Sequence, residues 1–122
     1  MRLLDTKKEH MINILRHTFV AILLLVTGLA NAALVSVTGK VTSTYSYSDF
    51  GTGDVVFQMN SIGVGCEAGF WLRPTDPGFK SNLSFLLAAQ LSGRTVAILG
   101  YNDSIWGGSS GKFCRLYQIS IQ

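Results

Sequence analysis

The sequence predicts a mainly β domain that contains one α-helix. Apolar and polar residues alternate with a period of two over several short stretches, which is typical of β-strands. One stretch between them has helical features: Asp76 is a favourable N-cap, Pro77 suits the first helical position, and Gly93 can adopt the left-handed conformation that ends a helix. The resulting order is three strands, a helix and two strands. It matches the five-stranded OB-fold barrel, whose single α-helix lies between strands 3 and 4.

Five strands are expected around this helix, at Leu34–Thr44, Asp54–Met59, Gly65–Arg73, Arg94–Tyr101 and Phe113–Ile121. The first alternates valines with Ser, Thr and Lys, which indicates one buried and one exposed face. In the last, the alternation changes phase after Leu116, which predicts a β-bulge. Long polar loops are expected at Tyr45–Gly53 and Asn102–Lys112. A β-sandwich is not expected, because it needs more strands than this chain supplies.

The helix has two unlike faces. At 100° per residue, Phe79, Leu83, Leu86 and Leu87 lie together, and we expect this face to pack on the barrel. The opposite side is small and weakly polar, whereas a solvated helix normally carries Lys and Glu there. It is either a poorly charged free surface or an interface with neighbouring subunits. We favour the interface, because a small domain gains stability from assembly. The expected interface residues are Ser81, Phe85, Ala88, Ala89 and Ser92.

Residues 1–32 have the pattern of a secretory signal peptide. Basic residues precede the apolar run Phe19–Val26, and the small residues Ala30-Asn31-Ala32 follow it. The run is shorter than the ~20 apolar residues of a membrane-spanning helix. We therefore expect cleavage after Ala32, export through the periplasm to the outside, and a single secreted domain at residues 33–122. No membrane span is expected in the mature chain.

The basic character of the chain belongs largely to this leader. The whole chain has a formal net charge of +3, but residues 33–122 carry six Lys and Arg against five Asp and Glu, which leaves +1. Single-stranded nucleic acid needs an electropositive groove on an OB fold. Nucleic acid is therefore not an expected partner.

Two cysteines, Cys66 and Cys114, fall in the mature region. A disulfide is the expected state in an oxidising compartment, and the predicted barrel puts the two residues on neighbouring strands. The bond closes a loop of 48 residues, which stabilises the fold by about 3–4 kcal/mol in the chain-entropy model. A metal pair and a reactive thiol are the weaker alternatives, because His10 and His17 both lie in the leader and the chain has no CxxC.

No catalytic residue, metal or cofactor is expected. The absence of histidine after residue 17 excludes His-based triads and His-ligated metals from residues 33–122. The carboxylates are scattered through turns and caps. The stretch Gly51–Gly53 lacks the helix and Lys that follow a phosphate-binding loop. We therefore expect a non-enzymatic protein.

The candidate binding site lies in two loops. OB folds bind ligands through the face of strands 2 and 3 and through the loops that join strands 1–2 and 4–5. Aromatic rings stack on the C–H surfaces of sugars, and amides and carboxylates hydrogen-bond to sugar hydroxyls. The expected ligand is therefore a glycan, and the candidate contacts are Tyr45, Tyr47, Asp49, Asn102 and Trp106. In the competing interpretation, Trp106 and Phe50 plug the ends of the barrel.

The stretch from Cys66 to Trp106 resembles one protein family. The shared features are Cys66, Trp71, Pro77-Gly78-Phe79 at the start of the helix, Leu86-Leu87 with Ala89, Ser92–Ile98, and Trp106. This pattern is similar to the receptor-binding B subunits of AB5 toxins, in particular those of subtilase cytotoxin and of typhoid and pertussis-like toxins. The chain departs from them in its cysteine pairing, and an aromatic pair that contacts sugar in those relatives falls at Ala88 and Gln90 here.

The resemblance implies a secreted, non-catalytic OB-fold subunit. It implies a homopentameric ring that binds sialylated glycans on host cells and carries a catalytic A subunit. Two alternatives remain. One is a stand-alone exported OB-fold protein that binds a periplasmic ligand or protein, and the other is a small exported enzyme inhibitor.

Overall fold

The computed structural model describes residues 2–24 and 33–122. The chain divides into two compact units, Met1–Asn31 and Ala32–Gln122. Among its described residues, the first contains one helix, α1 (Arg2–Leu24). Within the described residues, no helix is both long enough and apolar enough to cross a membrane. The predicted cleavage site, Ala30-Asn31-Ala32, lies outside the described residues.

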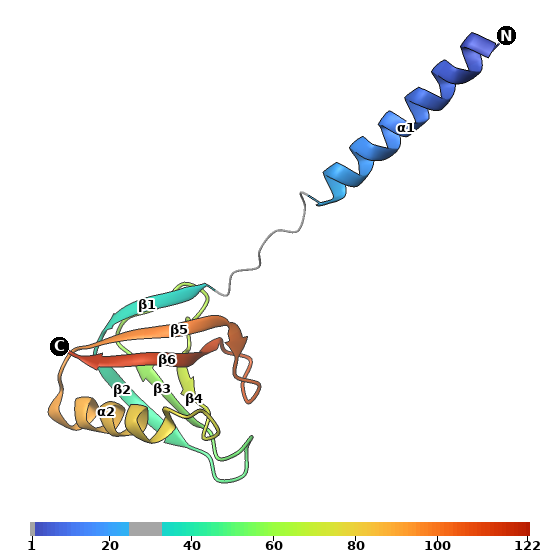
Figure 1. Cartoon of the computed structure of the whole chain (residues 1–122). Helices are drawn as coiled ribbons and strands as arrows, with labels where there is room; N and C mark the ends of the chain where they lie inside the picture. The colour runs from blue at the N-terminus through green and yellow to red at the C-terminus, as the bar shows by residue number, and fades with distance from the viewer. Residues whose placement is uncertain (1, 25–32) are drawn as a thin grey trace. The chain divides into compact units, whose positions relative to one another are not determined.

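The second unit contains one six-stranded sheet and one helix (Figure 1). The mainly β class and the position of the helix are confirmed, but the sheet has six strands rather than five. The elements are β1 (Leu34–Gly39), β2 (Val41–Ser46), β3 (Val55–Met59), β4 (Gly69–Leu72), α2 (Phe79–Ser92), β5 (Val96–Ile105) and β6 (Phe113–Ile121).

The extra strand arises because the first predicted strand is divided at Lys40. The sheet order is β1-β5-β6-β4-β3-β2, so β1 and β2 are consecutive in sequence but stand at opposite ends of that order. Reciprocal hydrogen bonds hold the dividing residue: the Lys40 N–H donates to Asn60 Oδ1 (2.7 Å) and the Asn60 N–H donates to the Lys40 carbonyl (3.0 Å). A Cβ atom at Gly39 would lie only 2.5 Å from the same Asn60 oxygen, so the close approach favours glycine.

All strand pairs are antiparallel except β4–β6, which is parallel. Between β5 and β6 the register shifts from the Leu99–Gln118 pair to the Gly100–Leu116 pair, which leaves Tyr117 as the extra residue. This is the β-bulge predicted after Leu116. Strand β4 is shorter than expected, because Cys66 lies before it in a turn and forms only an isolated bridge with Gly63.

Helix α2 begins two residues later than predicted, and Asp76 is not its cap. The cap position is Gly78, which offers no side-chain hydrogen bond. The Asp76 carboxylate instead accepts hydrogen bonds at Oδ1 from Arg73 Nε (3.0 Å) and Nη2 (2.8 Å). A charged guanidinium is a stronger donor than a backbone N–H, which explains why the carboxylate pairs with Arg73 rather than capping the helix. The end of the helix is as predicted: Gly93 has φ of 66°.

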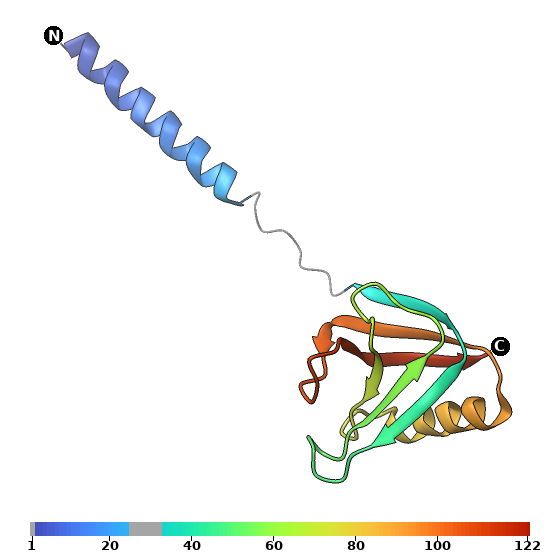
Figure 2. The same ribbon diagram turned by 180° about the vertical axis from the view of Figure 1, so that it is seen from behind.

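The core lies between the sheet and α2, which packs against β2, β4 and β6 (Figures 1 and 2). The helix contributes Leu86 and Ala89, both fully buried, with Phe79 and Leu83 at the edge. Two predictions about the helix are wrong. Leu87 is 43% exposed rather than packed on the sheet, and Ala89 lies in the core of its own subunit rather than at an outer interface. The small Ala89 side chain lets the helix approach the sheet closely.

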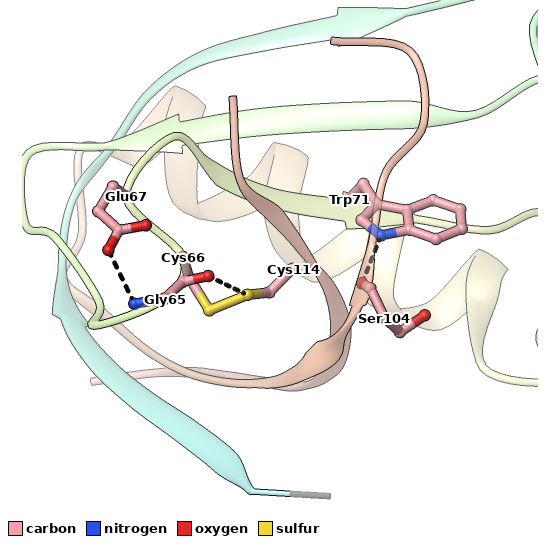
Figure 3. Close-up of a disulfide and its surroundings, with 6 residues drawn as sticks. All are labelled: Gly65, Cys66, Glu67, Trp71, Ser104 and Cys114. Atoms are coloured by element: carbon pink, nitrogen blue, oxygen red, sulfur yellow. Dashed lines mark hydrogen bonds between the residues drawn. A yellow bond between two sulfur atoms is a disulfide. The ribbon is translucent and has the colours of Figure 1, made fainter. Parts of the chain in front are cut away.

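The predicted disulfide between Cys66 and Cys114 is confirmed, with a Cα–Cα distance of 5.3 Å (Figure 3). It ties the turn before β4 to the start of β6. In the same turn, Glu67 accepts a hydrogen bond from the Gly65 N–H (3.0 Å). Hydrogen bonds from the backbone N–H groups of Glu67 and Gly65 stabilise the carboxylate and hold the pKa of Glu67 below its ordinary value.

Candidate functional site

The two predicted loops meet at Trp106. Its ring centroid lies 5.1 Å from that of Tyr47, 5.1 Å from that of Phe50 and 5.8 Å from that of Phe113. Trp106 is only 4% exposed. We call this group, Tyr47, Phe50, Trp106 and Phe113, the aromatic cluster. Since the β2–β3 loop and the β5–β6 loop are far apart in the sequence, tertiary packing brings these rings together.

A buried hydrogen bond fixes the centre of the aromatic cluster. Trp106 Nε1 donates to Asp54 Oδ2 (3.0 Å), and Asp54 is only 4% exposed. The backbone of the loop closes around the same residue: the Tyr47 N–H donates to the Asp54 carbonyl (2.9 Å), and the Asp54 N–H donates to the Phe50 carbonyl (3.2 Å). Trp106 is therefore held as a buried structural anchor rather than exposed as a ligand contact, whereas Phe50, which the competing interpretation paired with it, is 42% exposed.

Asp54 has no distinguishing signal in the sequence. It follows a glycine-rich turn, where an aspartate is ordinary. The glycine pattern carries a partial signal. At Gly51, where φ is 61°, a Cβ atom would lie 2.4 Å from Asp54 Oδ2, so this position needs glycine both for its conformation and for space.

The exposed candidates belong to β2 and the β2–β3 loop, and of these Tyr47 and Phe50 contact the anchor. Tyr45 is 49% exposed, Tyr47 38% and Phe50 42%, and Asp49 is exposed. Tyr45 belongs to β2 rather than to the loop, and its partner in β3 is Val56. An open depression of about 430 Å³ lies along the loop, lined by Ser46, Tyr47, Ser48, Asp49 and Phe50. It presents aromatic rings, hydroxyls and one carboxylate to solvent.

Asn102 lies elsewhere. It is half-buried in β5, which extends to Ile105 and takes in the first part of the predicted loop. Its Cβ atom lies 3.7 Å from the position that a Cβ atom would take at Gly65, in the turn that the disulfide holds. Nearby, Trp71 Nε1 donates to the Ser104 carbonyl (3.2 Å) and fixes this segment over β4 (Figure 3). No contact described for residues 33–122 joins Asn102 to the aromatic cluster.

A second depression, of about 260 Å³, lies at the start of α2. We call it the Arg115 depression. The sequence did not predict it, because its residues come from four separate segments. They are Asp76, Pro77, Gly78, Asn82, Tyr101, Arg115, Leu116 and Tyr117.

The outer face of α2 is apolar. Phe85, Leu87 and Leu91 are 47%, 43% and 89% exposed. The predicted interface residues Ser81, Phe85, Ala88 and Ser92 are exposed, unlike Ala89. The serines do not make this face polar, because their hydroxyls donate to carbonyls of the helix itself: Ser81 to Gly78 (3.0 Å) and Ser92 to Ala88 (2.7 Å).

No group of three or more His, Cys, Asp or Glu side chains that could hold a metal ion occurs among the described residues. Comparisons with protein-family models, with curated proteins and with solved structures found no match to this chain.

Proposed function

We propose that residues 33–122 form a non-catalytic OB-fold binding domain. In this proposal β1 and β2 are the two halves of one bent first strand, which reduces six strands to the five of the OB barrel. Three features support it: β1 and β2 are separated only by Lys40, they stand at opposite ends of the sheet order, and α2 lies between β4 and β5.

The proposed ligand is a glycan of the host cell surface, and the proposed contact is the β2–β3 loop. The observation that carries this proposal is the pair of exposed rings at Tyr47 and Phe50 against an anchored Trp106, with the exposed Tyr45 two residues before Tyr47. A rigid aromatic platform loses little entropy when a sugar stacks on it. The Asp49 carboxylate and the serine hydroxyls in the same depression are suitable partners for sugar hydroxyls.

The proposed assembly is a homopentamer that acts as the sialoglycan-binding delivery subunit of an AB5-type toxin, with a catalytic A subunit as its partner. The AB5 assignment rests on the resemblance of Cys66–Trp106 to B subunits. The apolar outer face of α2 supports subunit contact, because exposed Phe85 and Leu91 gain from burial. Five weak sites on one ring gain avidity without strong single contacts. The alternative is a stand-alone exported OB-fold protein that binds a periplasmic ligand or protein.

A glycan array tests the ligand. The exported, processed protein is applied as wild type, as the double variant Tyr45→Ala/Tyr47→Ala, and as the control Ile62→Ala, which removes an exposed apolar side chain outside the proposed site. We expect the double variant to lose at least tenfold in binding and the control to bind like wild type. An array without a glycan hit for the wild type contradicts the proposed ligand.

Light scattering tests the assembly. We expect a pentameric mass for the wild type and for the control Ile62→Asp, and a monomeric mass for Phe85→Asp, because the proposed subunit contact would bury an unpaired carboxylate at this exposed position. A wild-type monomer at micromolar concentration would favour the stand-alone alternative.

A further inference from the structure

The Arg115 depression contains a cation whose only described ion-pair partner within residues 33–122 is shared with a second arginine. The Arg115 side chain is 23% exposed, and its nearest carboxylate oxygen, Asp76 Oδ1, lies 4.0 Å from Nη1. That oxygen already accepts two hydrogen bonds from Arg73. Within residues 33–122, no hydrogen bond is described for the Arg115 side chain, and its Nε atom is buried without a partner. A buried guanidinium N–H without a hydrogen-bond acceptor costs free energy.

The charges around the depression favour an anion. Asp76 and Arg115 line it, and Arg73, which lies outside its lining, pairs with the same carboxylate, so the three groups together leave one positive charge in excess. The depression also lies against the start of α2, where Gly78 provides no side-chain cap and the first turn contains no acidic residue. The partial positive charge of a helix N-terminus adds to the field of the two guanidinium groups.

Aromatic walls restrict the shape of the anion. The Arg115 guanidinium lies 4.8 Å from the centroid of the Tyr101 ring. The Tyr117 and Tyr101 rings pack edge to face, with their centroids 5.3 Å apart. Stacking on Tyr101 holds the planar guanidinium in place. Tyr117, the extra residue of the β-bulge, is 50% exposed and forms the outer wall. The site therefore suits a carboxylate that is attached to a ring with both hydroxyls and apolar surface.

We infer that the Arg115 depression binds the carboxylate of an acidic sugar. The carboxylate meets the Nη atoms of Arg115, and a small rotation of the guanidinium gives the buried Nε–H an acceptor. The sugar ring rests against Tyr117, and the Asn82 side chain is available to a hydroxyl. This inference rests on the proposed glycan-binding function and assigns the acidic residue of the glycan to a site that is separate from the β2–β3 loop.

The strand register relates the two sites. Tyr45, Val56, Trp71 and Arg115 lie opposite one another across β2, β3, β4 and β6, so their side chains share one face of the sheet. Three strand spacings of ~4.8 Å separate Tyr45 from Arg115 by about 14 Å. The buried Trp71 lies between them. The two sites therefore occupy the same face without sharing a residue.

The test measures binding of the methyl glycoside of N-acetylneuraminic acid by ligand-observed NMR, with its carboxamide as the uncharged probe. The exported protein is used as wild type, Arg115→Gln, Tyr117→Ala and the matched control Arg94→Gln, which removes an exposed arginine at the far end of α2. We expect the carboxylate probe to bind at least tenfold more tightly than the carboxamide. We expect Arg115→Gln to abolish that preference, Tyr117→Ala to weaken both probes, and Arg94→Gln to behave like wild type.

The outcomes separate the two proposals. If the wild type binds sugars but Arg115→Gln and Tyr117→Ala leave its affinity for the acidic probe unchanged, the inference is wrong and the proposed glycan-binding function stands. Equal binding of the two probes by the wild type also contradicts it. If the wild type binds no sugar on the array or in solution, both proposals fail. Because Tyr117 is half-exposed, its alanine variant keeps the test valid if Arg115→Gln fails to fold.

Discussion

The aromatic cluster and the Arg115 depression lie on one face of the same sheet but differ in how their polar groups are satisfied. In the aromatic cluster, the buried Asp54 carboxylate and the Trp106 indole N–H satisfy each other at 3.0 Å. In the depression, the Arg115 side chain has one ion-pair contact at 4.0 Å and a buried Nε without a partner. A satisfied buried pair stabilises the fold, whereas an unsatisfied cation is available to a ligand. Asp54 and Trp106 are therefore structural residues, whereas Arg115 is the residue proposed to bind a ligand, a distinction that aromatic content alone does not make.

The largest expected effect comes from the disulfide. Its Cys114 lies between Phe113 of the aromatic cluster and Arg115, so the cross-link is next to both regions. Replacing both cysteines by alanine is expected to lower the free energy of unfolding by about 3–4 kcal/mol, because the cross-link no longer reduces the conformational entropy of the unfolded chain. Urea denaturation measured by tryptophan fluorescence checks this, with reduced wild type as the reference. If the double variant is as stable as oxidised wild type, the two regions do not depend on the cross-link.

The next effect breaks the satisfied pair. Asp54→Ala leaves the buried Trp106 N–H without an acceptor, and we expect a loss of about 2 kcal/mol in the free energy of unfolding. Asp54→Asn keeps an oxygen acceptor and is expected to lose less than half as much. Equal stability of the alanine variant and wild type would show that Trp106 is not anchored by this bond.

The opposite result is expected at the unsatisfied cation. Arg115→Met keeps most of the packing volume and removes a desolvated charge, so we expect the free energy of unfolding to stay within about 1 kcal/mol of wild type or to rise. Denaturant unfolding of Arg115→Met and Asp54→Ala under the same conditions compares their changes in the free energy of unfolding. A loss at Arg115 as large as that at Asp54 would remove the distinction between the two regions.

The smallest effect concerns Glu67, in the turn that the disulfide ties to both regions. The folded-state pKa of Glu67 is lowered by the backbone N–H groups of Glu67 and Gly65. A lowered pKa contributes stability above the ordinary pKa of glutamate, and that contribution disappears as the pH falls through the folded value. A carbon-detected NMR titration is expected to place its midpoint below that of an unstructured glutamate, and Glu67→Gln is expected to reduce the pH dependence of stability on the acid side. A midpoint at the ordinary value would contradict the capping hydrogen bonds.

Local signals predicted the elements well. Alternation located the strands, Gly93 located the end of the helix, and the phase change after Leu116 located the bulge at Tyr117. These signals work because strand periodicity and the left-handed conformation depend on neighbours in the chain. The predicted start of the helix was wrong, because the Asp76 carboxylate has another partner in Arg73. Only the folded loop brings that guanidinium to it.

The candidate site was predicted only in outline. The sequence identified both loops, and Tyr47 and Trp106 do come together. It could not tell that Trp106 is buried while Tyr45 is half-exposed, since both are aromatic residues beside turns. The sequence pattern placed Leu87 on the buried face of α2 and Ala89 on its outer face. The structure has them the other way round, because the helix is rotated so that the smaller side chain meets the sheet.

Periodicity, the conformational preferences of single residues and the number of cysteines were enough to predict the β class, the place of the helix and the pairing of the two cysteines. Which polar groups find partners depends on the tertiary structure. Asp54 and Trp106 meet across two loops, and Arg115 lies against a tyrosine and a carboxylate that is already occupied. Hydrogen-bond satisfaction depends on distances of a fraction of an ångström between remote segments, and no local pattern carries that information.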